Sequence, residues 1–473
     1  MRIVQTFWTA GRDPLKYPFG WSHPEYNLMS WALSCLSLRE HYDDVALYTD
    51  PEGYDVLISK LHLPYTEVNV AYDKNLCLPH HWAYAKIKTY SMQTKPFLHI
   101  DGDVYLPHPI PEDIANAPLV AQNREIGTRY YRSMIDHLLG YPEIILPEFI
   151  QRGLAVQSIP SYNMGIFGGS DLDFIHRYCK EAEDFLQVNN MNDLSERVSK
   201  IDCNVFFEQI LFAVFADSEQ REVTTIHERS IKDKGYTAEE FCSLENYNHC
   251  QFFHLLGNHK KKANITEMLC RRCFVSCPEQ HNSIIKLFPR WHSRLFDKGE
   301  ICVMTSLSDS SISEYIDFLN ESEQFWTHIS TEELYNLEKK IINSAYLFYS
   351  GTIKYTQQNV RCHPYYRCFN VPSSWNENQL NCLRNYLSVT EKMCPLKYVC
   401  VIPSIYPNIR NNFVLQETDM EVLRYVEKNT VSANDIMDRM TSHISEMSKN
   451  AYRQFFMTRI DALIKNKIIL LTH

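Results

Sequence analysis

The first 265 residues alternate short apolar runs with amphipathic stretches, which is typical of a mostly parallel sheet covered by helices. The apolar runs predict strands at residues 2–9, 45–49, 66–70, 97–100 and 162–168. Helices are expected at residues 25–41, 54–61, 79–92 and 170–186, and a capping box of Ser170 and Asp173 is expected to begin the last of them. Residues 205–216, VFFEQILFAVFA, are apolar on nearly all sides and predict a buried helix.

This alternation stops near residue 265, and a helix-rich region follows with helices expected at residues 312–320 and 331–349. Residues 350–415 are rich in Pro, Tyr, Cys and Asn and show no pattern that assigns them. The C-terminal segment predicts helices around residues 420–426, 433–440 and 452–464, and then a strand at 468–471. Three helices and a strand favour a small winged-helix-like module. The expected domains are therefore residues 1–265, 266–415 and 416–473.

Composition narrows the class of protein. A chain of 473 residues with 45% hydrophobic and 13% aromatic residues is expected to fold into two or three domains. Its formal net charge of −10 argues against a nucleic-acid partner, because that affinity comes from Lys and Arg neutralising phosphates. No apolar run is long enough for a membrane span, and the N-terminus, MRIVQTFWTA, does not resemble a signal peptide. We therefore expect a cytoplasmic protein.

The chain contains 15 cysteines, an odd number that is scattered along its length. Without a secretion signal, reduced thiols are the simpler interpretation. The alternative is a small zinc site, for which the densest cluster has suitable spacing: Cys250, Cys270, Cys273 and Cys277.

A pair of carboxylates is the first candidate for chemistry. Asp101 and Asp103 follow the apolar strand at residues 97–100 and flank Gly102. Ligands of open α/β sheets bind at the carboxyl ends of the strands, where both carboxylates are able to reach one hard cation. The glycine lets the backbone turn close to that cation. The simpler alternative is a turn at the end of a strand.

A second motif, His254-Leu255-Leu256-Gly257-Asn258-His259-Lys260, favours the metal site. Together with Asp101 and Asp103, it resembles the glycogenin-like retaining glycosyltransferases (family 8), which have the GT-A nucleotide-diphospho-sugar fold. The resemblance implies that Asp101, Asp103 and His254 ligate Mn²⁺, or Mg²⁺, at the donor diphosphate. It also implies that Gly257 allows close approach to the diphosphate and that Lys260 contacts its phosphates. Two carboxylates and an imidazole suit a manganese-type ion better than Ca²⁺.

The resemblance extends over about residues 1–265 and implies further roles. Asn163, in Asn163-Met164-Gly165, would bind the donor sugar, and Glu208-Gln209 would lie near the sugar and the reaction face. Thr6 would line the nucleobase and ribose. Lys86 would approach the diphosphate, although a solvated helix lysine is an equally good interpretation. Glu208 also has a physical argument: its segment is otherwise apolar, so the carboxylate needs a polar pocket or a partner.

The sequence also departs from the family pattern. The residues after Lys260 are Lys261-Lys262-Ala263, where the family usually has an aromatic or Pro-Trp sequence. The Asp or Asn on the first strand that reads uracil in many relatives is not evident. The resemblance implies a UDP-sugar donor, but these departures leave the nucleobase and the sugar open.

The expected activity is the metal-dependent transfer of a sugar from a nucleotide-diphospho-sugar to an acceptor hydroxyl, with retention as in the relatives. One alternative is a catalytically silent scaffold of the same fold that acts through its C-terminal module. Another is a nucleotidyltransferase. Such enzymes usually need a Gly-rich, basic first loop, and residues 11–16, GRDPLK, match that loop poorly. The C-terminal segment from Glu417 has eight basic and eight acidic residues, so DNA binding is not expected. Peptide recognition by this module would make the acceptor a peptide or protein.

Overall fold

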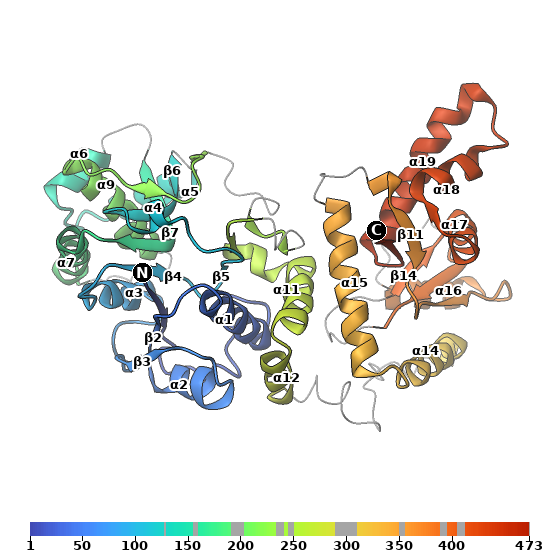
Figure 1. Ribbon diagram of the computed structural model, residues 1–473, viewed down its shortest axis with the longest axis horizontal. Helices are drawn as coiled ribbons and strands as arrows, with labels where there is room; N and C mark the ends of the chain where they lie inside the picture. The colour runs from blue at the N-terminus through green and yellow to red at the C-terminus, as the bar shows by residue number, and fades with distance from the viewer. Residues whose placement is uncertain are drawn as a thin grey trace. The chain divides into compact units, whose positions relative to one another are not determined.

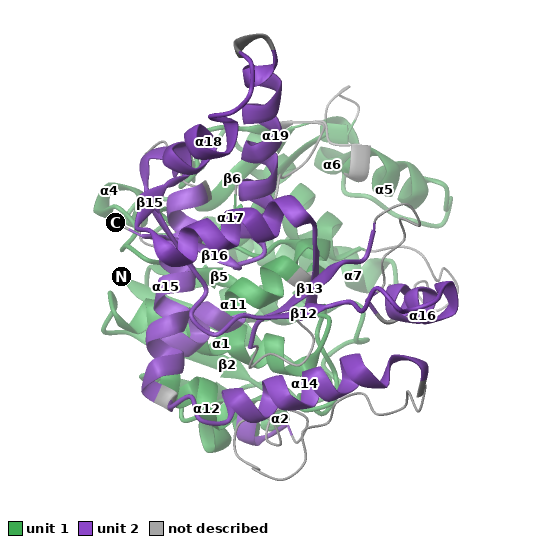
Figure 2. Cartoon of the chain, turned by 90° about the vertical axis from the view of Figure 1, so that its right-hand side faces the viewer, with its two compact units in different colours: residues 1–269, 277–284 green, residues 270–276, 285–473 purple. Residues whose placement is uncertain are grey.

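The computed structural model (Figure 1) describes residues 1–126, 129–154, 159–190, 203–232, 241–244, 250–288, 310–349, 355–387, 395–403 and 412–472. The chain forms two compact units (Figure 2). Unit 1 comprises residues 1–269 and 277–284, and unit 2 comprises residues 270–276 and 285–473. Helices α11 (Ala263–Ser276) and α12 (Pro278–Lys286) contribute residues to both units.

Unit 1 is built on an eight-stranded sheet with the order β3-β2-β1-β4-β7-β6-β8, in which β9 also pairs with β6. All of its pairings are parallel except those of β7, which is antiparallel to β4 and β6. This confirms the prediction of an α/β fold with a mostly parallel sheet. Its strands are β1 (Arg2–Phe7), β2 (Val45–Thr49), β3 (Glu67–Val70), β4 (Phe97–Ile100), β6 (Val120–Ile126), β7 (Pro160–Gly169), β8 (Thr224–Thr225) and β9 (Ile231–Lys232).

Helices cover both faces of this sheet because neighbouring strand residues point to opposite sides. Val4 and Phe97 pack with residues of α3, α7 and α9, whereas Ile3 and Leu98 pack in a second cluster with Leu38 of α1. The helices of unit 1 are α1 (Pro24–Arg39), α2 (Pro51–Tyr54), α3 (Ala83–Ser91), α4 (Glu112–Ala115), α5 (Arg129–Leu139), α6 (Glu148–Leu154), α7 (Leu172–Val188) and α9 (Leu211–Ser218). A π-helical turn, Asp55–Lys60, continues α2.

The start of α7 differs from the expected capping box. The N-cap is Asp171, whose carboxylate accepts a hydrogen bond from the Phe174 amide at 3.1 Å. The Ser170 hydroxyl instead lies 3.3 Å from the carbonyl oxygens of Asn116 and Ala117. The prediction of Ser170 as the cap was therefore wrong by one residue, because the preceding loop takes its hydroxyl.

The apolar segment at residues 205–216 forms the buried helix that its sequence predicts. A π-helical turn, Phe206–Ile210, leads directly into α9, and nearly every side chain of both is buried. This helix is too short to cross a bilayer, and no helix among the described residues has the length and apolarity of a membrane span.

Unit 2 joins the region expected at residues 266–415 to the module expected at 416–473. Its two sheets have the orders β15-β11-β16 and β12-β13-β14. The strand β11 (Asn359–Cys362) lies between β15 (Val431–Ser432) and β16 (Ile469–Thr472), so the unassigned stretch supplies the central strand of the C-terminal fold. The remaining strands are β12 (Arg367–Asn370), β13 (Tyr398–Val401) and β14 (Asn412–Leu415). The helices are α14 (Ser313–Trp326), α15 (Thr331–Tyr349), α16 (Glu377–Leu387), α17 (Glu417–Lys428), α18 (Ala433–Thr441) and α19 (Glu446–Lys465).

We predict that Gly168→Ala strongly destabilises unit 1. Gly168 has a φ of +154°, and an added Cβ would lie 2.1 Å from the Phe97 carbonyl oxygen of the neighbouring strand β4. The expected loss is about 3 kcal/mol in the free energy of unfolding, since both backbone strain and overpacking oppose the substitution. Urea unfolding followed by tryptophan fluorescence measures it. Gly140→Ala, whose Cβ would come no closer than 3.2 Å to its neighbours, is the control. Equal midpoints for the two variants would contradict the prediction.

Candidate functional site

The acidic loop after β4 is held in place by helix α1. The Ser34 hydroxyl donates to the Val104 carbonyl at 2.7 Å, and the Ser30 hydroxyl donates to the Gly102 carbonyl at 2.8 Å. Residues four apart lie on one face of a helix, so α1 presents both hydroxyls to the loop. These two hydrogen bonds hold the backbone of the loop from which Asp101 and Asp103 project.

Gly102 leaves room for an aromatic ring beneath this loop. A Cβ at Gly102 would lie 2.4 Å from the indole ring of Trp31. Trp31 is on α1, one residue after Ser30, and is buried. The glycine between the two aspartates thus serves close packing as well as the turn.

His254 reaches the loop through a short antiparallel pairing. The strand β10 (Phe253–His254) pairs with β5 (Val104–Tyr105), which begins directly after Asp103. The Leu255 amide also donates to the Asp103 carbonyl at 3.0 Å. Two segments that are far apart in sequence thus place an imidazole beside the aspartates.

The hydrogen bond of His254 to Gln122 fixes which ring nitrogen faces the aspartates. His254 Nδ1 lies 2.7 Å from Gln122 Oε1, and Gln122 Nε2 in turn donates to Asn123 Oδ1 at 3.0 Å. Because an amide oxygen only accepts, His254 Nδ1 carries the proton. The other ring nitrogen, Nε2, then faces the aspartates and lies 3.5 Å from Asp103 Oδ1, so it is the atom that would ligate a metal. The ring fits only because Gly165 has no side chain: a Cβ there would lie 2.4 Å from His254 Cε1.

Asp101, Asp103 and His254 each offer a ligand atom, and these atoms lie within 4.8 Å of one another. Two carboxylates and one imidazole at this spacing are able to hold a metal ion. Burial raises the pKa of Asp103, but the charges of Lys260 and His254 lower it more, so that the pKa lies well below its usual value. No other such group occurs among the described residues, so the zinc site considered at the cysteines is not supported there: Cys250, Cys270, Cys273 and Cys277.

Lys86 is buried beside Asp101 and forms two ion pairs. Its Nζ lies 2.9 Å from Asp101 Oδ1 and 2.5 Å from Glu208 Oε1, and it donates to the Met164 carbonyl at 3.3 Å. Lys86 is 5% exposed and Glu208 is 1% exposed. Burial lowers the pKa of Lys86, but the two carboxylates raise it above its usual value, so the ammonium is charged. Burial raises the pKa of Glu208 and of Asp101, and the attraction of Lys86 only partly offsets this.

Lys260 is the basic partner of Asp103. It belongs to a 3-10 turn, Gly257–Lys261, whose first residue has a φ of +45° and leaves open space where a side chain would be. Lys260 Nζ forms an ion pair with Asp103 and lies 5.7 Å from the centre of the Trp21 ring. The turn thus places the Lys260 ammonium, and the backbone of Gly257 without a side chain, beside the loop of Asp101 and Asp103.

These groups border a cleft of about 760 Å³ within unit 1. A volume of this order suits a nucleotide-sized ligand, since small-molecule sites span about 300–1,000 Å³. The predicted residues that line it are Thr6, Lys86, Asp101, Asp103, Gly257 and Lys260. The aromatic lining was largely missed, because aromatic residues in a sequence indicate core as readily as a cleft: Trp8, Tyr17, Phe19, Trp21, Trp31 and Trp82.

The other predicted residues, Asn163, Glu208, Gln209 and His254, are not among the residues that line the cleft. The Asn163 carboxamide accepts a hydrogen bond from the Gly165 amide at 3.0 Å, and Gln209 accepts one from the Tyr131 hydroxyl at 3.0 Å. Glu208 faces Lys86, as described above. Thr6 lines the cleft, and its hydroxyl also lies 3.0 Å from His99 Nε2. The roles in sugar transfer expected of Asn163, Gln209, Glu208 and Thr6 stay predictions.

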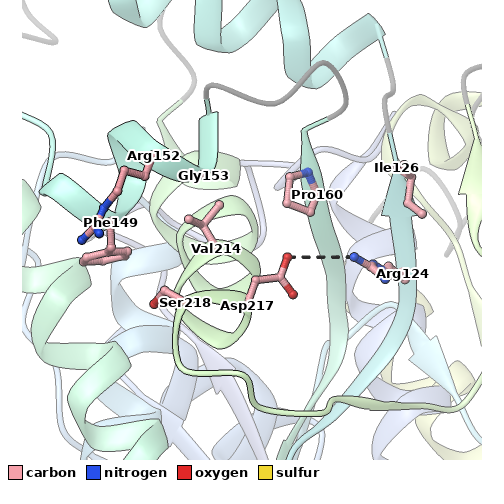
Figure 3. Close-up of a pocket in the computed structure, with 9 residues that line it drawn as sticks. All are labelled: Arg124, Ile126, Phe149, Arg152, Gly153, Pro160, Val214, Asp217 and Ser218. Carbon is pink, nitrogen blue, oxygen red and sulfur yellow. Dashed lines mark ion pairs between the residues drawn. The ribbon is translucent and has the colours of Figure 1, made fainter.

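A second cavity of about 570 Å³ lies between β6, β7, α6 and α9 (Figure 3). Arg124 points across it toward Asp217, with 3.9 Å between Nη2 and Oδ2. The remaining lining is mostly apolar, with Ile126, Phe149 and Val214. It includes none of the predicted site residues.

Comparison with known proteins places unit 1 in a family. Residues 1–287 match the model described as a family of unknown function (DUF6734). This range contains Asp101, Asp103, His254 and Lys260. No curated protein matches the chain.

We predict that Gln122→Met weakens Mn²⁺ binding by about 10- to 100-fold, because outer hydrogen-bond partners orient metal-binding histidines. Methionine has a similar volume and removes the acceptor of the His254 Nδ1 proton. Titration calorimetry with Mn²⁺ measures the affinity. The control is Gln151→Met on α6, which removes an amide that donates to the Leu146 carbonyl at 2.8 Å. If both variants bind Mn²⁺ like the unmodified protein, Gln122 does not orient a metal ligand.

Proposed function

We propose that this chain, which belongs to the DUF6734 family, is a metal-dependent glycosyltransferase that transfers a sugar from a nucleotide-diphospho-sugar to an acceptor hydroxyl. One observation carries the proposal. Asp101, Asp103 and His254 converge at the edge of a cleft sized for a nucleotide, with Lys260 beside them. A site for a divalent cation next to a lysine is the arrangement that a diphosphate leaving group requires.

In this proposal the two aspartates and His254 Nε2 would hold Mn²⁺ or Mg²⁺, which would supply positive charge to a diphosphate leaving group. Lys260 lies beside Asp103, where it is positioned to contact phosphate oxygens. Gly257 leaves open space that lets backbone approach the ligand closely. No protein nucleophile is required, because the developing charge is stabilised electrostatically.

The cleft also has the chemistry expected of a nucleoside site. Aromatic side chains provide surfaces for stacking, with Trp82 and Trp21 each near a lysine ammonium at the cleft. A UDP-sugar donor and retention of configuration are part of the proposal through the resemblance to glycogenin-like enzymes. The GT-A assignment is supported by the acidic loop at the carboxyl end of β4 in a mostly parallel sheet.

We keep a peptide or protein acceptor as part of the proposal. Helices α17, α18 and α19 followed by β16 are the pattern on which the winged-helix-like assignment depends. Modules of this kind often recognise peptides by strand addition. A scaffold without catalytic activity is the alternative function, and the intact set of Asp101, Asp103, His254 and Lys260 favours the enzyme.

The test of the proposal is a thermal-shift panel of nucleoside diphosphates with Mn²⁺ and with chelator. We expect stabilisation by a nucleoside diphosphate only when Mn²⁺ is present, because the two carboxylates alone would repel the ligand. Asp103→Asn and His254→Ala should abolish both this shift and donor hydrolysis. Lys260→Ala should mainly weaken the diphosphate affinity, by about tenfold or more.

The control variant is Asp217→Asn, which removes a carboxylate of the second cavity and should leave the shift unchanged. A diphosphate that stabilises the metal-free protein as strongly as the loaded protein would overturn the proposed metal dependence. Unchanged donor hydrolysis in all three site variants would show that the site has been misplaced.

A separate prediction concerns Glu208, which the structure pairs with Lys86. Glu208→Gln keeps the shape and removes the charge, leaving Lys86 buried with Asp101 as its one carboxylate partner among the described residues. If the ion pair is the whole role of Glu208, unfolding should become easier by about 3 kcal/mol, with little change in transfer rate. If Glu208 also supports charge at the sugar carbon, the rate should fall while donor affinity is kept. Urea unfolding and single-turnover transfer separate the two, and a variant unchanged in both would exclude both roles.

A further inference from the structure

Unit 2 carries a pair of thiols at directly opposed positions of two strands. Strands β12 and β13 are antiparallel, and Cys368 lies opposite Cys400. Opposed residues of antiparallel strands have Cα atoms about 4.5–5.5 Å apart. A disulfide requires about 4.4–6.8 Å between Cα atoms, so these two backbones already satisfy its main restriction.

The side chains of the pair face each other. Directly opposed residues of paired strands project to the same face of the sheet, so the two thiols are neighbours. The Cys368 thiol and burial together raise the pKa of Cys400 well above its usual value. Both cysteines are unbridged in the structure. The two sulfur atoms thus meet on one face of the sheet.

The neighbours of the pair show which face this is. Cys400 packs in the core cluster that includes residues of α17, α18 and α19, and Cys368 lies against the same cluster. Val399 and Val401, the residues on either side of Cys400, pack in a different cluster. Cys362 of β11 approaches from the other sheet of unit 2, and burial together with the nearby Glu427 and Cys368 raises the pKa of Cys362 to about 12. The thiols therefore meet where the two sheets of unit 2 adjoin.

A metal site is the first alternative for clustered thiols. Among the described residues, however, Cys362, Cys368 and Cys400 do not form a group with all ligand atoms within 4.8 Å, as Asp101, Asp103 and His254 do. The Cys362 thiol instead donates to the Leu423 carbonyl at 3.7 Å. The geometry thus suits a bond between two sulfurs better than a cation held by three.

We propose that Cys368 and Cys400 are a reversible dithiol–disulfide site of unit 2. Cys368 is half-buried, which gives an oxidant access to its sulfur, whereas Cys400 is completely buried and reacts only with its neighbour. A solvent-accessible thiol beside a resolving thiol is often found in redox-sensitive cysteine pairs, and Cys368 is partly accessible. This site is independent of the sugar-transfer site in unit 1.

The oxidant that the proposal names is a hydroperoxide. The Cys368 thiolate attacks the peroxide oxygen, forming a sulfenic acid and releasing water or an alcohol. The Cys400 sulfur then attacks the sulfenic sulfur, the S–S bond forms, and the sulfenic hydroxyl leaves as water with the thiol proton. In total, two thiols lose two electrons and two protons, and the peroxide is reduced. A small-molecule thiol reverses the change by exchange.

The experiment treats the reduced full-length protein with hydrogen peroxide under native conditions and maps its disulfides by mass spectrometry after alkylation. We expect a Cys368–Cys400 linkage and a mass lower by two hydrogen atoms, both reversed by dithiothreitol. Cys368→Ser and Cys400→Ser should each lose the linkage. Cys382→Ser, which changes a half-buried cysteine on α16, should keep it.

Mapping of the unmodified protein decides the proposal even where a variant fails to fold. Absence of the linkage in folded, peroxide-treated protein would overturn it, and so would a linkage that forms only after denaturation by urea. Stronger oxidation of Cys368 to sulfinic acid without a bond to Cys400 would also contradict it, because the resolving thiol would then be out of reach. Retention of the linkage in Cys382→Ser alone among the three variants would support it.

Discussion

The buried ammonium of Lys86 is the constraint on which the candidate site depends. A charge this deeply buried is tolerated only with paired carboxylates, and Lys86 has two, Asp101 and Glu208. These three residues come from α3, from the loop after β4 and from the π-helical turn before α9. The ion pairs therefore join three elements at one point, and they hold the acidic loop beside the cleft that Lys86 and Asp101 line. The same pairing explains why a carboxylate persists in the otherwise apolar segment at residues 205–216.

The second half of the site depends on contacts that are distant in sequence. His254 lies in place because β10 pairs with β5, and its ring orientation depends on Gln122 of β6 and on the missing side chain of Gly165 on β7. Together these contacts leave His254 Nε2 directed at Asp103. A two-residue pairing such as β5 with β10 has little stability of its own, so the placement of His254 depends on the larger sheet.

The local sequence pattern was sufficient to predict those elements in which the periodicity of apolar residues is the dominant effect. The strands β1, β2 and β4, helix α7 and the buried helix at residues 205–216 follow from periodicity, and Asp101, Asp103 and His254 follow from spacing and resemblance. Strand β6 was missed because its sequence, VAQNREI, is polar, although Gln122, Asn123 and Glu125 are buried. Hydrogen bonding to distant partners makes such burial possible, and one sequence does not reveal the partners. The placement of β11 between β15 and β16 was missed for the same reason.

The charges of the site link cation binding to anion binding if the proposed function holds. Lys260 forms an ion pair with Asp103, so its positive charge is already neutralised by that carboxylate. A divalent cation held by Asp101, Asp103 and His254 would take over the charge of Asp103 and leave Lys260 available to a phosphate oxygen. Anion affinity at Lys260 would then depend on the cation through this exchange of partners as well as through direct attraction. Lys86 does not take part in the exchange, because Glu208 remains its partner whichever charge Asp101 faces. One lysine thus holds the site together, and the other is positioned to respond to its ligands.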